Sequence, residues 1–329
     1  MGTRATRRVG ALALLGIALA LVSAGAQQAM AQNYPSRQIR LIVPFAAGGP
    51  ADLLGRVLAD EMSKDLGQQI FVDNRPGANT IIGAEIGAKA DPDGYTLLMA
   101  IDGTLVMNPF LYSKLSYDPF KDFAPISLIA RVPSVIEASL NMPANTLREL
   151  IDQAKSKPGD LLIGYSTPTS QVSIELLSKM AGIKFTLVPY RGGTTLVTAL
   201  LGGEIPLGHE SLNVSLPFAR AGKLKIIALT GNDRSPIAPE IPTVAETLPG
   251  FDLGIWQSIV APAKTPPAIV DRLHHEIVAV LNREAMRNTL ITAGLEPATS
   301  KSPQDLADFI RAQAEIRSKV IEAIGLKLD

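Results

Sequence analysis

The sequence predicts an α/β protein of two lobes around a cleft, in which each lobe is a mainly parallel sheet flanked by helices. Three observations support this prediction. Apolar strands alternate with amphipathic helices over residues 39–101, the alternation returns over residues 161–230, and an extended, β-rich segment at 126–140 crosses between the two. Strands and helices that alternate at short spacing form parallel sheets through right-handed crossovers.

The first repeat begins with the near-continuous apolar run Ile39–Val43, which is typical of a strand buried on both faces. Leu54, Leu58 and Met62 then recur at helical spacing, and Gly67 ends that helix. The predicted strands are 39–43, 70–72 and 96–101, and the predicted helices are 51–66 and 81–90. Ligands of such sheets bind beyond the carboxyl ends of the strands. The loops at these ends are 46–51, 74–80 and 102–104.

The second repeat follows the crossing segment, which contains Pro133. Thr146 and Glu149 form a capping box that starts a helix. The predicted strands are 161–165, 186–190, 205–208 and 225–230, and the predicted helices are 146–157, 171–181 and 194–201. After a proline-rich return segment, Pro266 and Pro267 open a helix to about 282, and Ser302 caps a last helix over 303–324. We therefore expect lobe 1 at 32–130 and 231–329, and lobe 2 at 131–230.

Residues 1–31 have the pattern of a signal peptide. Three arginines precede an apolar run at 9–22, and Ala29-Met30-Ala31 is a small-residue cleavage site. The Arg7-Arg8 pair leaves the Sec and twin-arginine export routes both open. The apolar run is too short for a membrane span, so we expect cleavage near Ala31, a periplasmic protein and no stable membrane insertion.

The composition excludes several classes of function. Hydrophobic residues make up 47% of the chain, which is enough for a sizeable core, and cysteine is absent. Disulfides, thiolate nucleophiles, cysteine-ligated metals and a lipid-anchored cysteine are therefore excluded. Removal of residues 1–31 takes away three arginines and no acid, so the remaining chain is mildly acidic. A mildly acidic chain without a basic block gives no support for nucleic-acid binding.

Enzyme motifs are also missing from the sequence. The stretch Gly48-Gly49-Pro50-Ala51-Asp52 is neither a dinucleotide-binding nor a Walker A loop, and no G-x-S-x-G occurs. His274 and His275 are helix neighbours that face different ways, so they make no zinc pattern. His209 ends a strand, where both a structural and a ligand-facing role remain open. We expect no catalytic residue, no metal and no cofactor.

The loops at the strand ends instead favour the binding of an anion. They are small, polar and rich in glycine, and each offers backbone N–H groups close to the start of a helix. Such groups stabilise negative charge without a titrating side chain, and several of them together suit a carboxylate. Asp52 opens the first of these helices, so it either caps the helix or contacts the ligand directly.

A set of short motifs, in a fixed order, identifies a related family. They include Ile42-Val43-Pro44-Phe45 with Gly48-Gly49 and Asp52, then Asn74-Arg75-Pro76-Gly77-Ala78, Pro92-Asp93-Gly94-Tyr95, Val188-Pro189-Tyr190-Arg191-Gly192-Gly193, and Pro242-Thr243-Val244-Ala245-Glu246. With these motifs the chain resembles the extracytoplasmic solute-binding proteins of the tripartite tricarboxylate transporter system, the Bug family. The resemblance covers essentially all of the chain after the signal peptide.

The resemblance implies a type II periplasmic-binding-protein fold, with two hinged lobes and the ligand in the cleft between them. In the family, two loops of the first lobe hold a ligand carboxylate through backbone groups and bridging waters. The corresponding residues here are Phe45, Ala46, Ala47, Gly48, Gly49 and Asp52, together with Gly77, Ala78, Asn79 and Thr80. In the second lobe, the resemblance points to Ser166, Thr167, Thr169 and Glu210.

The chain departs from the family pattern at three places. The loop Ser166–Ser170 is shorter than the usual glycine-rich loop, Glu210-Ser211 stands where the family has Asp-Asn, and Asn79-Thr80 replaces a glycine. Two of these departures lie in the second lobe, which contacts the part of the ligand that varies. Aliphatic dicarboxylates and aromatic acids therefore both remain open as ligands.

We expect a monomeric binding protein that captures a small organic carboxylate and delivers it to a transporter with two integral-membrane subunits. Two alternatives remain at the level of the sequence. The same binder could present its closed form to a signalling partner, or a secreted α/β enzyme could use Asp52 or Glu210 as a base on a carboxylate substrate.

Overall fold

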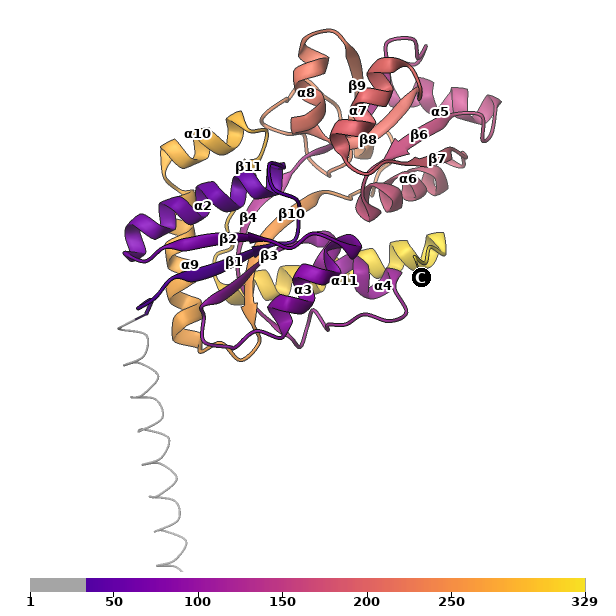
Figure 1. The fold of residues 1–329 in the computed structure, drawn as a ribbon. Coiled ribbons are helices and arrows are strands. Elements are labelled where there is room, and N and C mark those ends of the chain that lie inside the picture. Colours follow the sequence, from indigo (N-terminus) through magenta and orange to yellow (C-terminus); the bar gives the residue numbers. More distant parts are fainter. Residues whose placement is uncertain (1–33, 329) are drawn as a thin grey trace, which may run out of the picture.

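The computed structural model describes residues 34–328 and contains two sheets, one in each lobe (Figure 1). The strand order is β11-β4-β10-β3-β1-β2 in the first sheet and β7-β6-β8-β5-β9 in the second. The two-lobed α/β fold is thus confirmed, with one difference. Each sheet is mixed, because antiparallel strands extend a parallel core. The predicted signal peptide, residues 1–31, lies outside the described residues.

The first sheet has its parallel core at one side. Its strands are β1 (Ile39–Val43), β2 (Ile70–Asn74), β3 (Thr96–Ile101), β4 (Phe123–Val132), β10 (Ile255–Pro262) and β11 (Glu296–Pro297). Strand β1 pairs in parallel with β2 and β3, whereas β10 runs antiparallel to both β3 and β4. The carboxyl ends of β1, β2 and β3 therefore lie at one edge of the sheet.

Helices cover both faces of this sheet. They are α2 (Pro50–Leu66), α9 (Pro267–Leu281) and α10 (Glu284–Thr292) on one face, and α3 (Ile81–Ala88) and α11 (Pro303–Ile324) on the other. Leu41 and Val43 pack toward α2 and α9, whereas Ile42 packs toward α3 and α11. This alternation explains why β1 is apolar apart from Arg40, since a strand with two covered faces has little polar surface; Arg40 pairs with Asp73 of β2.

The second sheet is built in the same way. Its strands are β5 (Ser134–Ser139), β6 (Leu162–Tyr165), β7 (Thr186–Pro189), β8 (Leu207–Ser211) and β9 (Leu224–Leu229). Strand β6 pairs in parallel with β7 and β8, and β5 runs antiparallel to β8 and β9. Helices α5 (Leu147–Ser156) and α6 (Pro168–Ala181) pack on one face, and α7 (Gly193–Gly202) and α8 (Leu212–Arg220) pack on the other.

The crossing segment passes from one sheet to the other at Pro133. Strand β4 belongs to the first sheet, β5 belongs to the second, and Pro133 separates them. Proline has no N–H to donate to a strand ladder, so a break between sheets is a favourable place for it. The predicted crossing strand is therefore confirmed as two strands with a change of sheet between them.

The return to the first lobe comes later in the chain than residue 231. Val244, Phe251 and Leu253 lie in the core of the second sheet, and Ala238 and Ile241 pack beside β9 and α8. The packing therefore keeps residues 231–253 with the second lobe and returns to the first sheet only at β10. Proline-rich segments carry no periodic pattern, which explains why the boundary predicted at residue 231 is too early.

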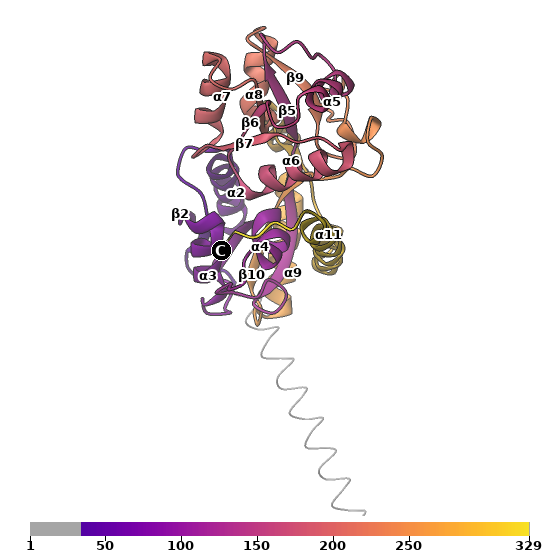
Figure 2. The same cartoon turned by 90° about the vertical axis from the view of Figure 1, so that its right-hand side faces the viewer.

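The two lobes share apolar contacts on one side of the molecule. Ile321 of α11, Met107 of the helical turn η2 (Gly103–Met107) and Leu111 of the short helix α4 (Asn108–Leu111) all join the core of the second sheet. Helix α11 packs against α6, and Lys179 of α6 donates to the carbonyl of Ala323 at 2.6 Å. Figure 2 shows α11 beside the junction of the lobes.

Candidate functional site

The loops at the strand ends of the two lobes meet at one hydrogen bond. Asp102 directly follows β3, and Thr169 lies in the first turn of α6, which follows β6. The Thr169 hydroxyl donates to Asp102 Oδ2 at 3.3 Å, and both residues are buried. Because parallel strand ends share an edge, this contact brings the predicted loops of the two lobes to the same junction. We call it the interlobe edge.

The first loop of this edge, residues 45–49, presents its backbone to solvent. Ala46, Ala47 and Gly48 are exposed, whereas Phe45 and Gly49 are partly buried. Gly48 has φ 85°, a left-handed conformation that glycine adopts without strain. Gly49 is the N-cap of α2, so the loop leads directly into the positive end of that helix dipole.

Asp52 holds this loop from behind. Its Oδ2 accepts from the Gly48 N–H at 2.9 Å and from Arg56 Nε at 3.0 Å, and its Oδ1 accepts from Asn74 Nδ2 at 2.9 Å. Asn74 Nδ2 also donates to the Phe45 carbonyl at 3.1 Å. The hydrogen bond and charge of Arg56, with the donors Gly48 and Asn74, lower the pKa of Asp52 to about 2. The Asp52 oxygens are thus filled by protein donors, which favours the loop-holding role over direct ligand contact.

The second loop, residues 77–80, has an unusual backbone. Gly77 has φ 129°, and Ala78, Asn79 and Thr80 follow with φ 45°, 51° and 74°. Non-glycine residues in this region cost roughly 1–2 kcal/mol each, so three in succession need support from their surroundings. Gly77 also has no room for a side chain, since a Cβ would lie 2.6 Å from Ile82 Cδ1.

Side chains from the next segment supply that support. The hydroxyls of Thr80 and Thr104 lie 2.7 Å apart, Asn108 Nδ2 donates to the Asn79 carbonyl at 2.9 Å, and Asn79 Nδ2 donates to the Tyr112 hydroxyl. Thr80 is buried, so its hydroxyl points into the lobe rather than toward a ligand, while Ala78 and Asn79 are exposed. The loop is therefore a rigid, exposed stretch of backbone at the start of α3.

Asp102 is the polar group of the third strand end. It is fully buried, its Oδ1 has no hydrogen-bond partner among the described residues, and burial raises its pKa to about 6. The positive charge of the buried Arg317 opposes that rise. Arg317 itself donates to the carbonyls of Asp252 at 2.7 Å and Gly254 at 3.1 Å. The sequence marked 102–104 as a strand-end loop but gave no signal for the contact with Thr169.

In the second lobe, Glu210 joins the three strand-end loops. Its Oε2 accepts from the Ser166 hydroxyl at 2.5 Å, and its Oε1 accepts from the Ser211 N–H at 2.8 Å and hydroxyl at 2.7 Å. Its carboxyl group packs on Gly193, where a Cβ would lie 2.5 Å from Glu210 Cδ. Glu210 is 8% exposed. The loops after β6, β7 and β8 therefore converge on one carboxylate.

The remaining predicted residues of the second lobe belong to the start of α6. This helix begins at Pro168, earlier than the predicted residue 171, and Thr167 is its N-cap. Thr167 Oγ1 accepts from the Ser170 N–H at 3.1 Å, and the Ser170 hydroxyl in turn accepts from the Thr167 N–H at 2.9 Å. The true loop is therefore only Ser166–Thr167, because a proline at the first helical position extends the helix backward. Of the predicted residues, Ser166 binds Glu210 and Thr169 binds Asp102.

His209 lies on the other face of the second sheet from Glu210. It pairs with Ile136 of β5 and with Tyr165 of β6, on the face covered by α5 and α6. Its side chain is buried, neither ring nitrogen has a partner among the described residues, and burial lowers its pKa to about 4. The structure thus supports the structural role for His209.

Two absences apply to residues 34–328. No group of three histidine or acidic side chains in this range could hold a metal ion. None of its helices combines the length and the apolar character that a membrane span requires.

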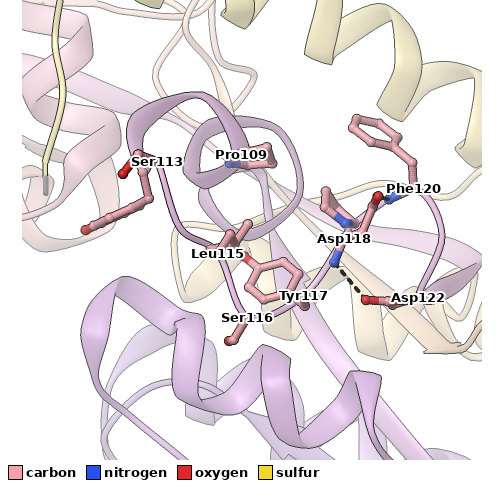
Figure 3. A pocket seen from close by; sticks show the side chains of 10 residues that line it. Pro109, Ser113, Leu115, Ser116, Tyr117, Asp118, Phe120 and Asp122 are labelled. Carbon is pink, nitrogen blue, oxygen red and sulfur yellow. Dashed lines mark hydrogen bonds between the residues drawn. The ribbon is translucent and has the colours of Figure 1, made fainter.

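A hollow of about 530 Å³ lies beside α4 and the segment that follows it (Figure 3). Its lining comes from the segment 109–122, including Tyr117, Asp118 and Asp122, and the Asp118 N–H donates to Asp122 at 2.7 Å. Tyr112, which also lines the hollow, accepts the hydrogen bond from Asn79. None of the predicted site residues lines it.

Comparisons with known proteins agree with this arrangement. The family model described as the tripartite tricarboxylate transporter family receptor matches residues 54–326. The protein BugT of Bordetella pertussis is 32% identical over 96% of this chain and 98% of its own length. An R. palustris protein solved with adipate superposes with a TM-score of 0.82 at 34% identity, covering 89% of this chain and 99% of that one. MatC from Rhodopseudomonas palustris, solved with bound malate, gives a TM-score of 0.78 at 31% identity, over 88% and 100% of the two chains. The chain belongs to the periplasmic receptor family of the tripartite tricarboxylate transporters.

Proposed function

We propose that this protein captures a small organic carboxylate between its two lobes and delivers it to a membrane transporter with two integral subunits. It acts in the periplasm as a monomer, after cleavage of the signal peptide near Ala31. The transport role follows from the family, and the relatives solved with adipate and malate support a carboxylate as the ligand.

The observation that carries the proposal is the pair of first-lobe loops at the interlobe edge. Both present exposed backbone, at Ala46–Gly48 and Gly77–Asn79, and both lead into the start of a helix. Backbone N–H groups at helix starts bind anions and need no cationic side chain. Asp52 and the Thr80–Thr104 pair hold the two loops in place before a ligand arrives, which lowers the entropy cost of binding.

The second lobe closes the site from the other side. The segments that connect the lobes are the β4–β5 passage at Pro133 and the return from β9 to β10. Two extended connections of this kind are the usual location of a hinge, and hinge closure around the ligand gives the transporter a distinct form to recognise. The contact between Asp102 and Thr169 lies where the closing lobes meet.

The arrangement of the two acids favours capture over catalysis. Asp52 and Glu210 are the residues considered as bases; protein donors fill both oxygens of Asp52, and Glu210 accepts from Ser166 and Ser211. A general base needs a free lone pair within hydrogen-bond reach of the substrate. Asp52 does not meet this requirement and serves to hold its loop. Glu210 also holds loops, but among the described residues its Oε2 accepts only the Ser166 hydroxyl and can accept one further hydrogen bond.

Thermal unfolding with a panel of acids tests the proposal. A ligand at 100 times its dissociation constant adds about 2.7 kcal/mol to the free energy of unfolding, which raises Tm by several degrees. We expect such a rise with at least one acid from a set of aliphatic mono- and dicarboxylates, amino acids and aromatic acids. No rise is expected with the matching alcohols or amides. Equal rises with acids and amides would overturn the proposal.

A further inference from the structure

The two lobes differ in how their loop-holding acid is neutralised. In the first lobe, Arg56 pairs with both oxygens of Asp52, at 2.9 and 3.0 Å. In the second lobe, Glu210 receives its hydrogen bonds from Ser166 and Ser211 alone. Among residues 34–328, no lysine or arginine forms an ion pair with Glu210, and the nearby Arg191 is exposed. The negative charge of Glu210 is therefore solvated by dipoles but not cancelled.

A second acid lies behind Glu210. In the register of β5 and β8, Val135 is opposite Glu210 and Glu137 is opposite Gly208, so both carboxyl groups are on one face of the sheet. Gly208 makes room for Glu137, since a Cβ there would lie 2.8 Å from Glu137 Oε1. Burial raises the pKa of Glu137 to about 8 against the opposing effect of Ser215, and the charge of Glu210 adds a smaller rise. At neutral pH the Glu137 carboxyl group is mostly protonated and therefore neutral, so it does not offset the charge of Glu210.

The location of Glu210 makes this charge relevant to the ligand. The carboxylate lies where the loops after β6, β7 and β8 converge, which is the second-lobe side of the interlobe edge. The hydroxyls of Ser166 and Ser211 line the same place and donate to it, so they are not free to donate to a ligand. A ligand group that enters here meets the carboxylate of Glu210, whose serine partners already donate their hydroxyl protons to it.

We propose that Glu210 selects ligands that carry a hydrogen-bond donor, best an ammonium group, at the end opposite their carboxylate, and that it disfavours a second carboxylate. This inference rests on the proposed function, in which the first lobe holds the carboxylate. A carboxylate brought close to an uncancelled like charge in a partly desolvated site loses affinity, whereas an ammonium group gains it. The preferred ligand class is then the ω-amino acids rather than the dicarboxylates.

Titration calorimetry with three six-carbon acids tests this inference on the unmodified protein. They are 6-aminohexanoate, 6-hydroxyhexanoate and adipate, which differ only at the far end; 4-aminobutyrate, 4-hydroxybutyrate and succinate repeat the comparison at shorter length. We expect the amino acid to bind at least about tenfold more tightly than the dicarboxylate, with the hydroxy acid between them. A dicarboxylate that binds as tightly as the amino acid at both lengths would overturn the inference.

The variant Glu210→Gln tests whether Glu210 causes the preference for the amino acid over the dicarboxylate. It retains the shape and one acceptor but removes the charge, so we expect the ratio of the two dissociation constants to fall by about tenfold. Glu204→Gln, an exposed acid of the same lobe, is the matched control and should leave the ratio unchanged. An unchanged ratio in a folded Glu210→Gln variant would contradict the assignment. If that variant does not fold, the order of the three ligand affinities for the unmodified protein still tests the inference. Failure of every acid to bind would instead reject the proposed function.

Discussion

The first and second lobes use the same device at the interlobe edge, an acid that holds the strand-end loops, but they treat its charge differently. Asp52 of the first lobe lies among Arg56, Asn74 and the Gly48 N–H, and its pKa falls to about 2. Glu210 of the second lobe has only serine donors and lies on the same sheet face as the buried Glu137. An acid that is paired with a cation leaves the neighbouring backbone free to bind an anion. An acid without a cationic partner favours a ligand group that donates a hydrogen bond.

The two lobes also differ in how their loops are held. In the first lobe, three successive left-handed residues depend on contacts with Thr104, Asn108 and Tyr112. In the second lobe, Ser166–Thr167 is short and leads into a helix with a complete capping box. The first lobe thus keeps a strained, preformed backbone for the group that all ligands share, and the second lobe uses side chains, which change more readily with the ligand.

The largest expected effect concerns pH and the buried Glu137. Its pKa in the folded protein, about 8, lies above the usual 4.5, so the folded chain retains a proton that the unfolded chain has lost. The contribution of Glu137 to the free energy of unfolding is therefore complete below about pH 4.5. It falls by on the order of 3 kcal/mol as the pH rises toward 8. Glu137→Gln should remove most of this slope in chemical unfolding experiments at pH 5 and pH 8. The buried Asp102 leaves a smaller slope of the same sign. A slope that is equal in the variant would contradict the account of the second lobe.

A second prediction concerns the space beside Glu210. A side chain at Gly193 would meet the carboxyl group at 2.5 Å, whereas one at Gly192 has nothing within 4 Å. Gly193→Ala should displace Glu210 and cost about 2 kcal/mol of stability. Gly192→Ala, at an extended residue with φ 172°, should change the stability little. Urea unfolding of the two variants checks this, and equal losses would show that the carboxyl group is not held there.

The third prediction removes the charge of the first-lobe acid. Asp52→Asn loses the ion pair with Arg56 but retains an acceptor for Gly48, so we expect a loss of about 1.5 kcal/mol. The low pKa of Asp52 also implies that its contribution is complete above about pH 4 and is lost as the pH falls through 2. The variant and the unmodified protein should therefore become equally stable near pH 2, as measured by thermal unfolding. A difference that persists at pH 2 would contradict the ion-pair account.

The smallest expected effect concerns backbone strain. Ala78→Gly relieves a left-handed alanine with φ 45° and should stabilise the folded protein by about 0.5 kcal/mol, after the entropy cost of glycine. Ala46→Gly, in the first loop, has no such strain to relieve and should destabilise it by about 0.5–1 kcal/mol. Both residues are exposed, so packing changes little. Opposite signs in urea unfolding confirm the difference between the loops, and equal signs would contradict it.

The sequence was a good guide wherever local pattern decides the structure. Strand β1 is apolar except for Arg40 because both of its faces are covered, and Gly67 ends α2 in the left-handed conformation that its position predicts. Thr146 likewise caps its helix as predicted, with its hydroxyl accepting from the Glu149 N–H at 3.2 Å, although the Glu149 side chain accepts from the Asn145 N–H instead of closing the box on Thr146. These features depend on neighbours within one turn or one strand, so a single segment contains the information.

The sequence was a poorer guide wherever distant segments meet. The contact between Asp102 and Thr169 joins residues of two lobes, and the approach of Glu137 to Glu210 depends on the register of β5 and β8. Thr80 was predicted at the site, but its hydroxyl turns inward to Thr104. Asp52 was assigned either a capping or a ligand role, and its donors Arg56 and Asn74 favour the holding of a loop. The local sequence pattern predicts neither the register of paired strands nor the direction in which a side chain points.

Calorimetry with two matched compounds is the most direct test of whether the first-lobe loops hold a carboxylate. The protein is titrated with 6-aminohexanoate and with 1-aminohexane, which has the same amine and chain length but no carboxylate. We expect binding of one molecule of the acid per chain and no measurable binding of the amine, because the first-lobe loops recognise the carboxylate. Equal binding of both compounds would contradict the claim that these loops hold a carboxylate.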